Sequence, residues 1–211
     1  MAEYRFVTFW HIRAPLQAVF EAVLESRQWP QWWRGAQEVR ELEPGDSQGI
    51  GSIRSYVWRS PTLYRVRFDA RAESIEWPYR IKASVSGDLA GSGHWHFSHD
   101  RQITTVRYEW HVRTTRKWMS MLAVVLRFPF AVNHRILMRR GAHGLAERLQ
   151  APLLAELSFE YGVGAGGDYG WAPRPSSSLG PAGSAPPDSL SQSPDQPSPS
   201  EASGNRHASM I

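Results

Sequence analysis

Hydrophobic and polar residues follow a strand-like pattern at the start of the chain and then a helical one. Residues 4–12 are rich in Tyr, Phe, Val, Thr and Trp, which is typical of a β-strand. Apolar residues then recur at the spacing of one helix face: Leu16, Val19, Phe20 and Val23. This spacing predicts a short helix that begins after Pro15. The segment WPQWW at 29–33 predicts a second short helix.

Strand-like runs separated by turn signals follow these helices. The runs span residues 39–43, 50–59, 63–77, 79–86, 91–98 and 103–115. In the last run, apolar Tyr108 and Trp110 alternate with polar Arg107, Glu109 and His111. Such alternation is typical of an antiparallel sheet with one covered face and one solvated face. The short connections indicate a meander.

A helical period returns between Lys117 and Gln150, where Pro129 should break or kink the helix. Gly141 and Gly144 are poor helix formers, so they indicate that another part of the chain approaches closely. The predicted fold is α+β: one strand, two short helices, six strands and a long C-terminal helix. One helix cannot fill the concave side of a curved seven-stranded antiparallel sheet, so we expect a cavity between them.

Alternation along the strands and the helix selects the residues expected to face this cavity. Thirteen residues are candidates for ligand binding: Trp32, Trp33, Tyr56, Tyr64, Phe68, Tyr79, Trp95, Phe97, Tyr108, Trp110, Phe130, His134 and Leu137. Ligand sites are mostly apolar with a few polar groups, as this set is. For any single aromatic residue, ordinary core packing is the alternative. The cluster of Trp29, Trp32 and Trp33 could plug the core, form a rim of the cavity, or touch an anionic membrane surface with Arg27 and Arg34.

His134 is the one candidate catalytic residue. It lies on the same helix face as Phe130 and Leu137. It could therefore hydrogen-bond a ligand, transfer a proton, or pack in the core without a functional role. His94 and His96 share a face of one strand. Because Trp95 and Phe97 are expected to point inward, the two histidines are expected to point outward. No third ligand has a matching short spacing, so we expect solvated histidines and no metal site. Paired carboxylates, a Ser/His/Asp order and a phosphate loop are all missing from the sequence.

Composition divides the chain in two. Residues 161–211 are rich in Gly, Ser and Pro, and eight of the 15 prolines lie between Pro173 and Pro199. This composition predicts a disordered tail that follows a single domain at 1–160. The domain has 22 basic and 16 acidic residues, a net charge of +6 that we interpret as dispersed surface charge rather than a nucleic-acid site. The chain has no cysteine, no secretion signal and no stretch suited to spanning a bilayer, so a cytoplasmic protein is expected.

Several segments resemble those of a known superfamily. They are APLQAVFEAV at 14–23, WPQWW at 29–33, ELEPGDSQGIGS at 41–52, GDLAGSGHW at 87–95, TTVRYEWHVRTT at 104–115 and NHRILMRRGAHGL at 133–145. With the order of elements, they make residues 3–152 similar to the START-like superfamily of helix-grip proteins. The nearest group is the bacterial SRPBCC proteins, also called the polyketide cyclase/dehydrase and lipid-transport family.

The resemblance implies a deep apolar pocket between the sheet and the C-terminal helix. It implies binding of a lipid, polyketide or similar molecule by a carrier or sensor. We expect no cofactor. A cyclase or aromatase acting on a polyketone in the same cavity is the alternative, because a minority of the superfamily are enzymes. The family has no universal catalytic residue set, so enzyme activity is left open. Oligomeric state and the identity of the ligand are not indicated by the sequence.

Overall fold

The computed structural model describes residues 3–59, 65–115 and 123–160 of the chain, and the side chains of 123–129 are not described. The strands are β1 (Glu3–Ile12), β2 (Ala36–Glu43), β3 (Ile53–Arg59), β4 (Arg65–Glu76), β5 (Arg80–Gly87), β6 (Leu89–Asp100), β7 (Ile103–Thr114) and β8 (Leu153–Glu160). The helices are α1 (Leu16–Leu24), α2 (Trp29–Trp32) and α4 (Ala123–Arg148), with a 3-10 turn, η1 (Ser26–Gln28), before α2. The predicted α+β class is therefore confirmed.

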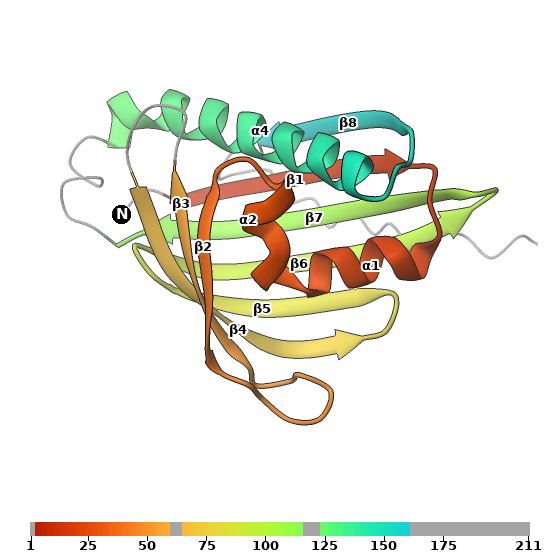
Figure 1. Cartoon of the computed structure of the whole chain (residues 1–211). Helices are drawn as coiled ribbons and strands as arrows, with labels where there is room; N and C mark the ends of the chain where they lie inside the picture. The colour runs from red at the N-terminus through yellow and green to blue at the C-terminus, as the bar shows by residue number, and fades with distance from the viewer. Residues whose placement is uncertain (1–2, 60–64, 116–122, 161–211) are drawn as a thin grey trace, which may run out of the picture. The chain divides into compact units, whose positions relative to one another are not determined.

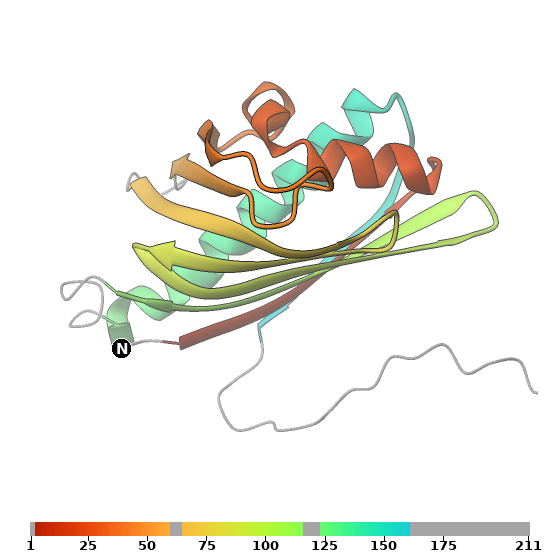
Figure 2. The same cartoon turned by 90° about the horizontal axis from the view of Figure 1, so that it is seen from below.

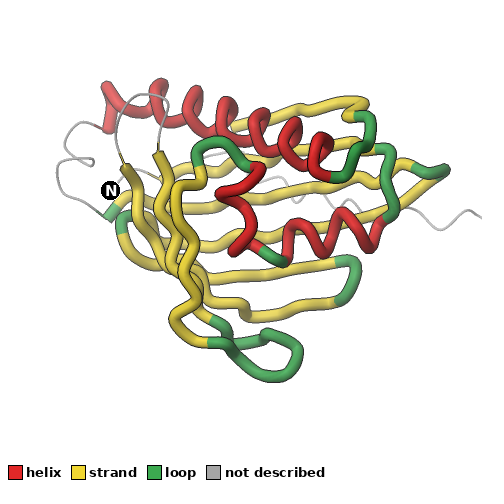
Figure 3. Tube along the Cα trace, in the orientation of Figure 1, coloured by secondary structure: helices red, strands yellow, loops and turns green. Residues whose placement is uncertain are grey.

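All eight strands form one antiparallel sheet, in the order β2-β3-β4-β5-β6-β7-β1-β8. The sheet is curved, and the three helices lie against the same face of it (Figures 1 and 2). Figure 3 shows α4 running along the sheet beside the short α1–α2 segment. The concave face of the sheet therefore looks toward helices, and its convex face does not.

The alternation that predicted the strands has a clear packing cause. Along β1 every second side chain is buried against the helices, including those of Tyr4, Phe6 and Trp10. In β6 the buried residues Trp95 and Phe97 alternate in the same way with partly exposed histidines. The most deeply buried large side chains gather where β1 meets α1 and α4: Trp10, Ile12, Val19, Phe20 and Leu145. This cluster anchors the helices to one end of the sheet.

Two features differ from the prediction. The sheet has eight strands rather than seven, because β8 returns after α4 and pairs with the free edge of β1. Its apolar residues Leu154, Leu157 and Phe159 are exposed, so the strand does not show the usual pattern of apolar residues on the covered face. The second difference is that α4 passes through Pro129 without a break. Proline removes one backbone hydrogen bond there because it has no N–H.

The expected close approach at the glycines of α4 is confirmed. A Cβ atom on Gly141 would come within 2.7 Å of the indole nitrogen of Trp33. A Cβ atom on Gly144 would collide with the backbone carbonyl oxygen of Trp32. The indole N–H of Trp33 also donates a hydrogen bond of 2.7 Å to the carbonyl of Leu137. These contacts hold α2 against α4. The tail predicted at 161–211 lies outside the residues that the structure describes.

Candidate functional site

A cavity of about 460 Å³ lies between the concave face of the sheet and the helices. Its volume falls in the range of roughly 300–1,000 Å³ that is usual for small-molecule sites. The wall draws on β3 to β7, on the loop before β3, on the α1–α2 segment and on α4. The cavity is therefore a product of the architecture and not of one loop.

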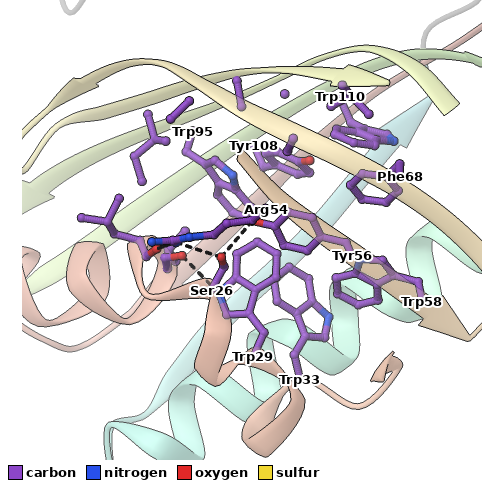
Figure 4. Close-up of a pocket in the computed structure, with 18 of the residues that line it drawn as sticks. Ser26, Trp29, Trp33, Arg54, Tyr56, Trp58, Phe68, Trp95, Tyr108 and Trp110 are labelled. Atoms are coloured by element: carbon purple, nitrogen blue, oxygen red, sulfur yellow. Dashed lines mark hydrogen bonds between the residues drawn. The ribbon is translucent and has the colours of Figure 1, made fainter. Parts of the chain in front are cut away.

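Aromatic rings cover the sheet side of the cavity (Figure 4). Trp95 on β6 and Tyr108 on β7 are directly opposite in register and stack with their ring centroids 3.8 Å apart. Tyr56 on β3 stacks on Phe68 of β4 at 5.3 Å, and Phe68 meets Trp110 at 5.6 Å. These rings come from inward-facing positions of β3, β4, β6 and β7, and apolar residues of β5 such as Ile81 and Val85 line the wall between them. Together they form a continuous apolar surface.

The opposite side of the cavity comes from helical segments. Trp29 and Trp33 face the sheet from α2 and its C-terminal end, with ring centroids 4.8 Å apart. Phe130, His134 and Leu137 lie on the wall from α4, at the spacing of one helix face. The ring of His134 stacks on Phe6 with centroids 4.1 Å apart.

One end of the cavity is polar. There the hydroxyls of Ser26 and Tyr56 share a hydrogen bond of 2.8 Å. Arg54 donates from Nη1 to the carbonyl of Leu24 at 2.7 Å and to the Ser26 hydroxyl at 3.0 Å (Figure 4). The Nε atom of Arg54 lies 3.5 Å from a carboxylate oxygen of Glu41. The guanidinium is therefore held in place by neighbours beside an otherwise apolar chamber.

Burial keeps three titratable side chains of the wall, those of Tyr56, Tyr108 and His134, uncharged near neutral pH. It raises the pKa of the Tyr108 hydroxyl well above its usual value. Burial also raises the pKa of Tyr56, against the opposing effect of Ser26 and Arg54. Burial lowers the pKa of His134 to about 3. Efficient general acid–base catalysis at neutral pH needs a group with a pKa near 7, so these side chains are suited to hydrogen bonding rather than to proton transfer.

His134 carries a polar atom that nothing in the described part of the chain satisfies. Its Nε2 atom is closed off from solvent and has no hydrogen-bond partner among the described residues. Leaving a buried polar group unpaired costs about 1–3 kcal/mol. A bound molecule with a suitable hydroxyl or carbonyl would remove that cost, since the residue lies on the cavity wall.

The structure places most of the predicted site residues on this wall. They are Trp33, Tyr56, Phe68, Trp95, Tyr108, Trp110, Phe130, His134 and Leu137. Their contact with a ligand stays a prediction. Tyr64 lies outside the described residues.

Three predicted residues sit elsewhere in the described structure. Tyr79 was expected to face inward, but it is 55% exposed because it belongs to the turn before β5, where strand alternation no longer applies. Phe97 points inward but packs against Phe20 of α1, with centroids 5.0 Å apart, instead of reaching the cavity. Trp32 stacks on the outer side of Trp33 and is not part of the wall formed by the described residues.

At the polar end of the cavity the sequence analysis selected Tyr56 but missed Ser26 and Arg54. Arg54 precedes Tyr56 by two residues on β3, so the two side chains share a face of the strand. That spacing was the available signal. It was overlooked because a charged residue in a strand is usually assigned to the solvent side. Trp58 on the wall was likewise not among the candidates, and Trp29 was considered only as part of the tryptophan cluster.

The outer face of the sheet holds a neighbour of the two histidines that the sequence analysis did not find. His94 and His96 lie on the side away from the cavity, as expected, and a third possible ligand is near them. Glu109 on β7 pairs in register with His94. Spacing within one strand could not show this, because the carboxylate comes from the neighbouring strand.

Sequence comparison identifies no relative, whereas the fold is shared by solved structures. No family model and no curated protein matches the sequence. A protein of Thermus thermophilus aligns with a TM-score of 0.57 at 15% identity, covering 70% of this chain and 99% of that one. A START superfamily protein from Mycobacterium smegmatis aligns with a TM-score of 0.53 at 11% identity, covering 70% and 97%.

A biosynthetic protein shares the fold as well. The di-domain ARO/CYC protein BexL aligns with a TM-score of 0.53 at 15% identity, over 71% of this chain and 51% of that one. This chain thus spans about half the length of BexL. Identities this low show the architecture alone, and on that ground the chain has a START-like fold.

Proposed function

We propose that the protein binds an apolar small molecule in the cavity, as a carrier or a sensor. The observation that carries the proposal is a chamber of about 460 Å³ with aromatic rings on both sides. Each 100 Å² of apolar surface removed from water contributes about 2.5 kcal/mol, so a mostly apolar ligand gains affinity from every wall of such a chamber. The rings of Trp95 and Tyr108 stack on each other, and those of Trp29 and Trp33 pack edge-on against Trp95. This aromatic wall favours a ligand with flat or ring-shaped parts.

The polar groups restrict which apolar molecules fit. Ser26, Arg54 and Tyr56 offer hydrogen bonds at one end, and His134 offers one from the side of α4. A ligand with an apolar body and one or two oxygen functions would satisfy both regions. A pure hydrocarbon would leave the Nε2 atom of His134 unpaired.

Binding can be tested with a fluorescent apolar probe, anilinonaphthalene sulfonate, and by native mass spectrometry of the protein as purified from its host. Ala83 on β5 lines the cavity, so Ala83→Phe should fill part of it and weaken probe binding about tenfold or more. Ser86→Phe is the matched control, because Ser86 is exposed on the same strand and faces the other way. Equal probe affinity in Ala83→Phe and the unchanged protein would contradict the proposal.

A cyclase or aromatase reaction in the same cavity is the second candidate. Likeness to the ARO/CYC protein BexL and the donors of Arg54 and Tyr56 at one end of the chamber favour it. The uncharged state of His134 and Tyr108 argues for positioning of a polyketone rather than rapid proton transfer. Incubation with a linear poly-β-ketone mimic should then give cyclised product by mass spectrometry, and Ala83→Phe should abolish it. Binding without any product would leave the carrier role alone.

Location and other partners remain parts of this proposal. None of the described helices is both long and apolar enough to cross a membrane. We keep the expectation of a cytoplasmic protein that uses no cofactor and does not bind nucleic acid. Contact with a membrane surface through Trp32 is less well supported, since that ring is stacked on Trp33 and half-buried.

A further inference from the structure

A cluster of possible metal ligands lies on the convex face of the sheet, on the side away from the cavity. His94 and His96 come from β6 and Glu109 comes from β7. One ligand atom of each residue lies within 4.8 Å of those of the other two. The Nε2 atom of His96 is 3.6 Å from Oε1 of Glu109. Two imidazoles and one carboxylate therefore converge on a volume small enough for a single ion.

The sheet fixes this arrangement. Residues two apart on a strand share a face, which places both imidazoles on the same side of β6. The register of β6 and β7 sets Glu109 directly opposite His94. Because β6 lies between β5 and β7 in the sheet, its backbone is paired on both edges. The ligands thus stand on a rigid framework instead of a loop, which favours defined metal geometry.

The side chain of His94 is a second, independent indication of a bound ion. Its Nε2 atom is closed off from solvent and accepts or donates no hydrogen bond within the described residues. Buried imidazole nitrogens normally have a partner, and a metal-bound histidine uses one nitrogen for the ion. A solvated surface histidine would not need such an explanation.

Positively charged side chains near the cluster oppose the binding of a cation. Arg107 donates to Oε1 of Glu109 at 2.7 Å, and it is paired in register with His96. Arg80 and Lys82 of β5 lie opposite His96 and His94. Lys82 is held 2.9 Å from a carboxylate oxygen of Glu73, which offsets its charge. A carboxylate has two oxygens and about four acceptor sites, so Glu109 can accept from Arg107 and still bind a metal ion.

We propose that His94, His96 and Glu109 bind a divalent transition-metal ion, with Zn²⁺ as the ion that best suits the ligand set. Two imidazole nitrogens and one carboxylate oxygen form a three-ligand set that tetrahedral Zn²⁺ accepts, with a fourth position for water or another molecule. Such an ion would join β6 to β7 on the convex face. It stands apart from the cavity and does not depend on the function proposed for it.

The test is a titration of the full chain, stripped of metal with a chelator, with Co²⁺ followed by absorbance and with Zn²⁺ followed by calorimetry. We expect one saturable site per chain. His94→Ala and Glu109→Gln should each weaken it roughly tenfold or more. Arg107→Gln should strengthen it, because this change removes the cation that competes for Glu109. His143→Ala should leave affinity unchanged, since His143 is exposed on α4.

Glu109→Gln is expected to weaken metal binding, whereas Arg107→Gln is expected to strengthen it. The test therefore stays decisive even if one of these variants folds poorly. Circular dichroism of each variant checks its fold before titration. Absence of saturable binding in the unchanged protein would overturn the proposal. So would binding that survives both His94→Ala and Glu109→Gln, because the ion would then sit on other residues.

Discussion

The indole ring of Trp33 occupies the space in which a side chain at Gly141 would begin. A Cβ atom added at Gly141 would come within 2.7 Å of the indole nitrogen, and that nitrogen already donates to the carbonyl of Leu137 on the same helix. This contact joins α2 to α4. It also sets the position of a ring that lines the cavity, so the stability of the fold and the shape of the site depend on the same pair.

Gly141→Ala should therefore destabilise the protein. Overpacking costs about 1–3 kcal/mol, whereas alanine in a helix gains about 1 kcal/mol over glycine. We expect a net loss of up to about 2 kcal/mol in the free energy of unfolding, measured by urea denaturation. In a Trp33→Phe background, where the ring is smaller, the same change should cost less. Stabilisation by Gly141→Ala alone would show that the two residues are not in contact.

Ser26 and Tyr56 form a second pair whose coupling can be measured. Both residues are buried, and their hydroxyls share a hydrogen bond of 2.8 Å. Ser26→Ala leaves the Tyr56 hydroxyl without this partner, at a cost of about 1–3 kcal/mol. Tyr56→Phe should then cost much less in the Ser26→Ala background than alone. Denaturation of the two single variants and the double variant gives the coupling energy, and simple additivity would contradict the hydrogen bond.

His134 should make the protein sensitive to acid. Burial lowers its pKa to about 3 in the folded protein, against about 6.5 in an unfolded chain. Below pH about 6.5 the unfolded chain therefore binds a proton that the folded protein does not. The contribution of His134 to stability is intact above that pH and is lost toward pH 3, by up to about 1.4 kcal/mol per pH unit.

Replacement of the imidazole isolates this effect. His134→Gln should flatten the dependence of unfolding free energy on pH between about 6.5 and 4, whatever it does to stability at pH 7. His143→Gln, on the exposed side of α4, should keep the dependence of the unchanged protein. If His134→Gln and the unchanged protein lose stability in parallel as pH falls, the imidazole is not buried in the neutral form.

Most strands could be predicted from the sequence because one face of the sheet is covered. Alternation located β4 to β7 wherever inward residues such as Trp95 and Tyr108 face helices or the cavity. It did not locate β8, whose exposed Leu157 and Phe159 resemble no half-buried strand. Alternation also misplaced Tyr79, because a turn fixes that side chain.

The candidate site was predictable only where a single strand or helix carries the information. The stripe of Phe130, His134 and Leu137 follows from helix period alone. The neighbour of His94 does not, since Glu109 reaches it through the register of two strands. Register is set by turn geometry and by packing across the whole sheet. The spacing of residues within one segment therefore cannot predict it.

Strand β8 is expected to stabilise the domain even though the sequence carries little sign of it. It pairs with β1 from Phe6 opposite Glu160 to Ile12 opposite Leu153, and the hydroxyls of Thr8 and Ser158 are 3.0 Å apart across the pair. A chain ending at Glu160 should melt at the temperature of the full chain, because it keeps every described element.

A chain ending at Ala151 should melt at a lower temperature and aggregate. Its β1 would become an edge strand with unpaired N–H and C=O groups, and such an edge is a template for pairing with another chain. Thermal denaturation with light scattering measures both effects. If the two shortened chains melt at the same temperature, β8 adds nothing to stability; if the chain ending at Glu160 fails to fold, the domain extends beyond the predicted boundary at residue 160.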